Sequence, residues 1–159
     1  MVRNRMNRRI ISSALTLVVL ATITALGSPS AAAAELSDYR WTHRPMLLFA
    51  PTDRDPQLVE TLSRIDASRC ALLERDVVIG IVLTEGQSTL AGQPVNAVEA
   101  QSLSERYGIG ENAFTALLIG KDGGEKLRVD EVPDLSTIYA VIDGMPMRRG
   151  EMRAGSSPC

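Results

Sequence analysis

Two cysteines are the side chains of this sequence best suited to redox or nucleophilic chemistry. Cys70 and Cys159 lie 89 positions apart. Outside the cytoplasm two thiols tend to pair, and a disulfide that closes so long a loop would add about 4 to 5 kcal/mol to the free energy of unfolding. Three interpretations stay open: a structural Cys70–Cys159 disulfide, two separate thiols with Cys70 buried, and a catalytic redox pair.

Catalysis by Cys70 would need a thiol pKa that is lowered by a helix N-terminus or by nearby cations. Cys70 instead lies late in a predicted helix, where the helix dipole raises a thiol pKa. Arg69 and Arg75 flank it in the sequence, but neighbouring positions on a helix point apart. Cys70 is therefore a weak catalytic candidate.

His43 is the only histidine, so a Ser-His-Asp or Cys-His site would have to use it. It precedes the first predicted strand, and we interpret it as a solvated or locally bonded side chain. A zinc site needs several nitrogen or sulfur ligands. The glycines Gly108 and Gly110 follow a predicted helix rather than a strand, which is the wrong order for a dinucleotide-binding loop. We therefore expect no metal and no cofactor.

A group of basic side chains is the one cationic concentration in an otherwise acidic domain: Lys121, Lys126, Arg128, Arg148 and Arg149. Alternation along a predicted hairpin places Lys126 and Arg128 on one face. Such a patch would suit an anion, an acidic glycan or an acidic partner. The competing interpretation is a solvated hairpin with local ion pairs to Glu125 and Asp130, each worth about 1 kcal/mol at most.

Hydrophobic patterns and cap residues predict the elements that position these groups. Predicted strands cover 45–50, 77–83, 114–119 and 125–129; predicted helices cover about 56–75, 97–107 and 135–143, with a loop at 84–95. The order β-α-β-α-β-β-α predicts a three-layer α/β unit with two parallel crossovers followed by an antiparallel hairpin and a covering helix. Trp41 and Tyr39 are expected to pack over the sheet edge.

The first 34 residues are typical of a bacterial secretory signal peptide. Four arginines precede an apolar run over 10–26, and Ala32–Ala34 fits the small-x-small cleavage rule. The alternative is an uncleaved membrane anchor, for which an apolar run of about 17 residues is short. We expect a periplasmic or secreted protein, with a signal peptide at 1–34, one domain at 35–147 and a flexible C-terminal tail at 148–159.

The net charge of the predicted mature chain disfavours some classes of binding partner. Without the first 34 residues the chain has 13 basic and 19 acidic side chains, a net charge of −6. Because an acidic surface repels phosphate backbones, nucleic-acid binding is disfavoured. We expect no membrane association after signal cleavage, and a partner that is an unknown protein or an anionic envelope or matrix component.

The order and lengths of the elements resemble the thioredoxin fold, and residues 107–124 are similar to the thioredoxin stretch from the second core helix through the hairpin. Thioredoxins place Cys-x-x-Cys after the first core strand, where this chain has Ala50–Pro56 without a cysteine. They also place a cis-proline just before the hairpin strand, where this chain has Phe114. Both parts of the dithiol machinery are missing.

A closer resemblance covers most of the predicted mature chain. Five segments carry it: Tyr39-Arg-Trp-x-x-Arg44, Leu47-Leu-Phe-Ala-Pro51, Glu74-Arg-Asp76, Lys121-Asp-Gly-Gly-x-Lys-Leu-Arg128 and Met145-Pro-Met-Arg-Arg-x-Glu151. They resemble the secreted family catalogued as domain of unknown function 4174, and related domains occur in animal extracellular-matrix and sushi-repeat proteins. The resemblance implies fold and compartment and no established reaction.

Taken together, the residues and the resemblances predict an exported thioredoxin-like domain without dithiol redox activity, acting as a binding or interaction module in the cell envelope. The alternative is a thiol redox or peroxidase-type factor that uses Cys70 as a single reactive cysteine.

Overall fold

The computed structural model describes residues 34–155. The predicted signal peptide, apart from Ala34, and the predicted disulfide partner Cys159 lie outside the described residues. The elements, in chain order, are η1 (Leu36–Tyr39), β1 (Arg44–Ala50), α1 (Pro56–Ala67), α2 (Arg69–Leu73), β2 (Val77–Leu83), β3 (Thr89–Leu90), β4 (Gln93–Pro94), α3 (Ala97–Tyr107), β5 (Thr115–Ile119), β6 (Glu125–Val129), α4 (Leu135–Asp143) and α5 (Pro146–Ala154).

One six-stranded sheet carries the fold, with the strand order β4-β3-β2-β1-β5-β6. Strand β1 is parallel to β2 and antiparallel to β5, and β5 forms an antiparallel hairpin with β6. The prediction of two parallel crossovers is therefore wrong for the second one. The β3–β4 hairpin reverses the direction of the chain between β2 and α3. Strand β5 then begins beside Phe49, at the carboxyl end of β1, and runs opposite to β1.

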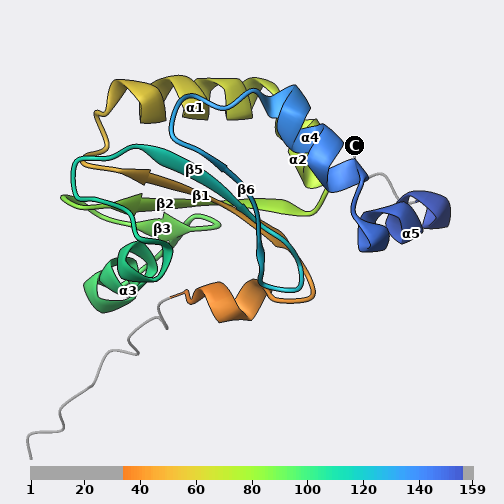
Figure 1. The fold of residues 1–159 in the computed structure, drawn as a ribbon, viewed down its shortest axis with the longest axis horizontal. Coiled ribbons are helices and arrows are strands. Elements are labelled where there is room, and N and C mark those ends of the chain that lie inside the picture. The colour runs from red at the N-terminus through yellow and green to blue at the C-terminus, as the bar shows by residue number, and fades with distance from the viewer. Residues whose placement is uncertain (1–33, 156–159) are drawn as a thin grey trace, which may run out of the picture. The chain divides into compact units, whose positions relative to one another are not determined.

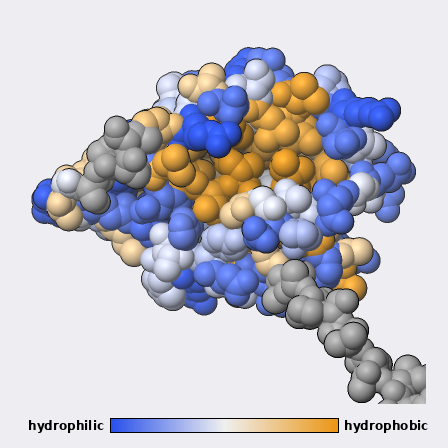
Figure 2. All heavy atoms as spheres, turned by 180° about the vertical axis from the view of Figure 1, so that it is seen from behind, coloured by the Kyte–Doolittle hydropathy of each residue, from blue (hydrophilic) through white to orange (hydrophobic). Residues whose placement is uncertain are grey.

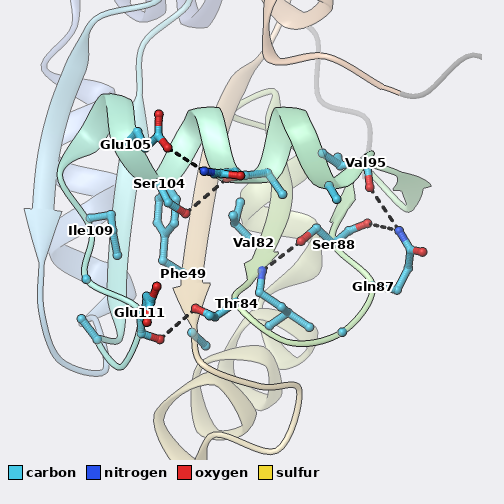
Figure 3. A pocket seen from close by; sticks show the side chains of 18 of the residues that line it. Phe49, Val82, Thr84, Gln87, Ser88, Val95, Ser104, Glu105, Ile109 and Glu111 are labelled. Atoms are coloured by element: carbon cyan, nitrogen blue, oxygen red, sulfur yellow. Dashed lines mark hydrogen bonds between the residues drawn. The ribbon is translucent and has the colours of Figure 1, made fainter.

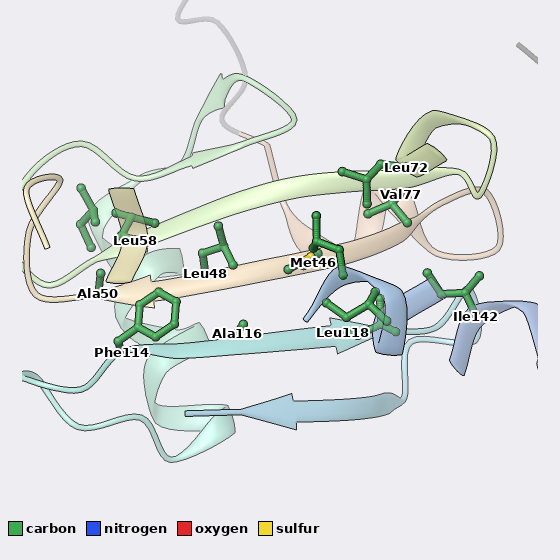
Figure 4. Packing of buried hydrophobic residues seen from close by; sticks show 13 residues of the cluster. Met46, Leu48, Ala50, Leu58, Leu72, Val77, Phe114, Ala116, Leu118 and Ile142 are labelled. Carbon is green, nitrogen blue, oxygen red and sulfur yellow. The ribbon is translucent and has the colours of Figure 1, made fainter. Parts of the chain in front are cut away.

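Helices cover both faces of the sheet, which confirms the predicted three layers (Figure 1). Because side chains alternate along a strand, β1 contributes to two cores. Met46 and Leu48 point into a core that also contains residues of α1, α2 and α4 (Figure 4). Leu47 and Phe49 point into a second core with residues of η1 and α3. All seven residues of β1 are buried, so this strand is the centre of the molecule.

The predicted helix starts are confirmed. The Asp55 carboxylate accepts hydrogen bonds from the backbone N–H groups of Gln57 and Leu58, with Pro56 in the first helical turn. The Asn96 side chain accepts from the Glu99 N–H at the start of α3, and the Asp134 side chain accepts from Ser136 at the start of α4.

Two predicted boundaries differ from the structure. The helix expected over 56–75 is interrupted at Ser68, whose φ of −117° leaves the helical region. The apolar periodicity nevertheless continues, because Leu72 of α2 still reaches the core. The segment expected as a loop at 84–95 contains β3 and β4, whose two-residue pairing is too short for periodicity to reveal.

The segment expected to be a loose tail is helical as far as Ala154. Proline at the first helical turn starts α5, and Arg148 on this helix is only 4% exposed. A polar composition indicates a solvated tail unless its charges find partners, and here they do. Residues 156–159 of the predicted tail lie outside the described part.

The surface is mixed in character. Seen from behind, apolar side chains gather in the middle of the face and hydrophilic side chains frame them (Figure 2). Within residues 34–155, no helix is long and apolar enough to cross a membrane.

Candidate functional site

Buried cations meet at the amino end of β1. Arg44, the first residue of β1, is 1% exposed. Its guanidinium donates to the Arg75 carbonyl at 2.9 Å and to Glu151 Oε1 at 3.0 Å. Lys121, which follows β5, donates from Nζ to Asp76 Oδ2 and to the same Glu151 oxygen, both at 2.7 Å. One carboxylate oxygen of α5 therefore joins two cations of the sheet.

Arg148 extends these contacts on the same side of the molecule. Its Nη1 donates to the Glu74 carbonyl at 2.7 Å, and its Nε donates to Asp143 Oδ1 at 3.2 Å. Arg75 donates to the other Asp143 oxygen at 2.7 Å. We call this set the ion network; its members are Arg44, Glu74, Arg75, Asp76, Lys121, Asp143, Arg148 and Glu151.

The ion network favours the charged form of two of its carboxylates, Glu151 and Asp143. Burial raises the pKa of Glu151, but hydrogen bonds from Arg44 and Lys121 outweigh burial and keep that pKa below its usual value. Burial likewise raises the pKa of Asp143, and hydrogen bonds from Arg75 and Arg148 lower it further than burial raises it. The four cations of the ion network balance its four carboxylates. Its ion pairs join α5 to the sheet, and we therefore also call the ion network the clasp.

The structure divides the five basic residues of the predicted anion patch. Lys121 and Arg148 belong to the ion network. On the hairpin, Lys126 donates to Asp122 at 2.6 Å, and Arg128 forms two hydrogen bonds with Glu125, of 3.0 and 2.9 Å, and one with the Tyr107 carbonyl. Arg149 is exposed on α5. The expected pair to Glu125 is present, while Asp130 accepts instead from Thr115. Anion binding by this set stays a prediction.

The predicted single-residue candidates lie at the surface. His43 contacts Thr42 through Nδ1 at 3.0 Å and packs edge-on against Tyr39. Trp41, expected to pack over the sheet edge, is instead 59% exposed, and the Arg40 guanidinium lies 5.1 Å from its ring. Its φ of +70° turns the chain outward at this position.

Cys70 lies on α2, at the end of the sheet where β2 begins. It is exposed rather than buried, and it is not a free thiol. Because Cys159 lies outside the described residues, the Cys70–Cys159 pair remains a prediction. Among residues 34–155, no three or more His, Cys, Asp or Glu side chains form a group that could hold a metal ion.

A cavity of about 720 Å³ lies at the carboxyl ends of β1 and β2 (Figure 3). It is bounded by α3, by the loop that follows β2 and by residues 108–113 that lead into β5. Its floor is apolar and buried, formed by Phe49, Val82, Val95 and Ala100. This cavity is the candidate functional site, since it combines an apolar interior with polar groups at its rim.

Hydrogen bonds hold the polar walls of the cavity in place. The Leu83 N–H donates to Ser88 Oγ at 3.0 Å, and Gln87 donates to the carbonyls of Ser88 and Val95. Across the opening, Thr84 Oγ1 donates to the Glu111 carbonyl at 2.8 Å. These bonds join the loop after β2 to the segment before β5, so that the cavity walls are preformed.

Sequence reasoning did not find this cavity. Its lining comes from three segments that are separated along the chain, and none carries a recognisable motif. The available signal was the row of small residues on α3, namely Ala97, Ala100 and Ser104, at positions three or four apart. Small side chains on one helical face permit either close packing or an open space, and the sequence does not distinguish the two.

Comparison with known proteins places the chain by sequence. The model of the family described as Domain of unknown function (DUF4174) matches residues 35–151. Coiled-coil domain-containing protein 80 of Danio rerio is 28% identical over an alignment 133 residues long, which covers 74% of this chain. The chain spans about 15% of that protein's length.

Solved structures are similar in fold. Thioredoxin peroxidase I of Plasmodium yoelii has a TM-score of 0.53 at 18% identity. The superposition covers 78% of this chain and 83% of the peroxidase chain. The reduced 2-Cys peroxiredoxin of Plasmodium vivax has a TM-score of 0.58 at 14% identity, with 72% of each chain covered. The mitochondrial 2-Cys peroxiredoxin of Plasmodium falciparum has a TM-score of 0.55 at 10% identity. The superposition covers 77% of this chain and 86% of the peroxiredoxin chain. The predicted thioredoxin-like fold is confirmed.

Proposed function

The chain belongs to the DUF4174 family, a domain of unknown function, and from this premise we propose that it is an exported thioredoxin-like binding module that works without dithiol redox chemistry. The cavity at the carboxyl ends of β1 and β2 carries this proposal. In open α/β sheets, ligands bind in the crevice beyond the carboxyl ends of the strands, where neighbouring connections leave on opposite faces. Here α1 leaves β1 on one face and α3 precedes β5 on the other.

The size and chemistry of the cavity support ligand binding. Its volume of about 720 Å³ lies within the range of small-molecule sites. Burying an apolar group against Phe49 and Val82 would contribute about 25 cal/mol for each Å² removed from water. The exposed amides of Gln87 and Gln101 at the rim offer additional hydrogen bonds.

The segment after β1 supports binding rather than dithiol exchange. Thioredoxins carry their two cysteines there, whereas this chain has a turn in which Asp55 caps α1. Phe114, which stands where thioredoxins have a cis-proline, is buried in the core beside α1 and α4. Among the described residues no peptide bond is cis.

Export is part of the proposal. Its support is the arginine-rich, then apolar sequence of residues 1–34, with small residues before Glu35. An exported domain in the cell envelope would meet its ligand in the periplasm or outside the cell, and its partners there would be small molecules, envelope components or other exported proteins.

A thiol peroxidase-type role for Cys70 is the second candidate, and the peroxiredoxins among the structural neighbours favour it. The position of Cys70 in the fold argues against a peroxidase-type role. Cys70 lies on α2, which precedes β2, whereas the cavity lies beyond the carboxyl end of the same strand. Cys70 does not line this cavity and lies toward the opposite end of β2.

Blocking the cavity tests the binding proposal. Ser104 lines the cavity from α3, so Ser104→Trp would fill it with an indole. The matched control is Ser63→Trp, because Ser63 is an exposed position on α1 that does not line the cavity. We expect small apolar fragments to shift the amide resonances of cavity residues in the wild type and in Ser63→Trp, and not in Ser104→Trp. Fragments that shift no cavity amide in the wild type would contradict the proposal.

A further inference from the structure

We propose that the cavity selects a small organic cation with an apolar body, such as an alkyl or aryl amine; this inference rests on the proposed binding function and names its ligand class. The observation behind it is the charge of the lining. Among residues 34–155, two ionisable side chains line the cavity, Glu105 and Glu111, and both are acids.

The two acids lie on the side of the cavity where Ile109 also lies. Figure 3 shows Glu105 above the cavity on α3 and Glu111 below it on the loop before β5. Glu105 accepts a hydrogen bond from Gln101 at 2.8 Å through one oxygen. Glu111 uses its backbone carbonyl to accept from Thr84, and within the described residues its side-chain carboxylate takes part in no hydrogen bond or ion pair.

In the described part of the chain, no cationic side chain lines the cavity to offset this charge. The nearest basic group along the hairpin, Arg128, donates to the Tyr107 carbonyl at the end of α3. Its guanidinium is, however, already paired with both oxygens of Glu125. The charge of Arg128 is therefore balanced by Glu125, and Arg106, which follows Glu105 on α3, interacts with Tyr107 and does not line the cavity.

The opposite part of the cavity selects for an apolar body. Phe49 and Val82 form the floor, and Val95 closes the side where the chain enters α3. Apolar atoms would lie on this floor, while an ammonium group would lie at the rim and donate to the oxygens of one of the two carboxylates. Hydrogen bonds of this kind, with a charged donor and a charged acceptor, are stronger than those between neutral groups.

The experiment compares three phenyl-alkyl probes of similar size and different charge: 2-phenylethylamine, 2-phenylethanol and 3-phenylpropanoate. Each is titrated into the isotopically labelled full domain, and the dissociation constant is read from the amide shifts of cavity residues. We expect the amine to bind about five- to tenfold more tightly than the alcohol, and the carboxylate to bind most weakly. Raising the salt concentration from about 0.02 to about 0.3 M should reduce the preference for the amine.

Charge removal identifies the groups responsible. Glu105→Gln combined with Glu111→Gln should weaken binding of the amine about fivefold and leave binding of the alcohol unchanged. The control is Glu99→Gln, an acid on the same helix that does not line the cavity, which should leave all three constants unchanged.

The outcomes separate this inference from the function on which it rests. If no probe shifts a cavity amide, the binding function itself fails. If the three probes bind equally, if the carboxylate binds most tightly, or if the double variant keeps full affinity for the amine, the cavity binds ligands and the selection for cations is overturned.

Discussion

Arg44 and Glu151 are 107 positions apart, and a 3.0 Å hydrogen bond from the guanidinium to the carboxylate joins the start of β1 to α5. Arg44 is almost fully buried at the amino end of the central strand. The polar C-terminal helix is therefore attached to the core by charge rather than by apolar packing. The segments of the family pattern that contain Arg44, Glu74–Asp76, Lys121 and Glu151 meet in this clasp.

Removing the shared carboxylate should destabilise the domain. Glu151→Ala leaves Arg44 and Lys121 without their common acceptor, and breaking a buried ion pair costs about 3 kcal/mol. The control is Glu60→Ala, which removes an exposed pair with Arg64 and should cost about 0.5 kcal/mol. Urea unfolding measures both. Equal losses in the two variants would show that the clasp contributes no more than a surface ion pair.

Acid should weaken the clasp. The pKa values of Asp143 and Glu151 are lowered in the folded state, so their contribution to the free energy of unfolding is complete above the unfolded carboxylate pKa of about 4. It is lost as the pH falls through the lowered folded values. The free energy of unfolding measured between about pH 7 and pH 2 should fall less steeply in Asp143→Asn combined with Glu151→Gln. Parallel curves for the wild type and the double variant would contradict this linkage.

The two cysteines should be paired. Cys70 is exposed on α2 and is not a free thiol, and Cys159 is the only other cysteine. Peptide mapping without reductant should therefore recover a Cys70–Cys159 peptide. Reduction should lower the free energy of unfolding by about 4 to 5 kcal/mol, because the loop that the bond closes is long. Recovery of Cys70 with a small-thiol adduct or an oxidised sulfur would instead support the redox candidate.

The basic hairpin should be replaceable without loss of the fold. Lys126 and Arg128 pair with exposed acids, so Lys126→Glu combined with Arg128→Glu should cost about 1 to 2 kcal/mol. If the hairpin is only a solvated element, the distribution of the protein between envelope and soluble fractions will stay unchanged. Release from the envelope fraction would show that this surface binds an anionic envelope component.

Local chemistry explains why much of the fold could be predicted. The apolar run of β1 and the caps Asp55 and Asp134 act over a few neighbouring residues, and each is found where the sequence predicts it. The direction of β5 could not be predicted, because alternation is the same in parallel and antiparallel strands. Helix α5 was missed because Arg148 and Glu151 find their partners on elements far away in the chain.

The candidate site was beyond sequence reasoning for the same reason. Phe49 and Ala100 are indistinguishable in sequence from ordinary core residues, and only their arrangement around an open space makes them a floor. The basic residues, which do stand out in sequence, are largely engaged with carboxylates. The most conspicuous charges of the sequence therefore belong to the clasp and the hairpin, away from the cavity.

Thiol turnover tests the central claim most directly. The full chain is purified after export and assayed for insulin reduction and for hydrogen-peroxide consumption with excess dithiothreitol, beside its Cys70→Ser variant. A binding module without dithiol chemistry should show, in both proteins, only the background rate of dithiothreitol alone. A rate well above that background in the wild type that is lost in Cys70→Ser would contradict the account and establish the chain as a thiol enzyme.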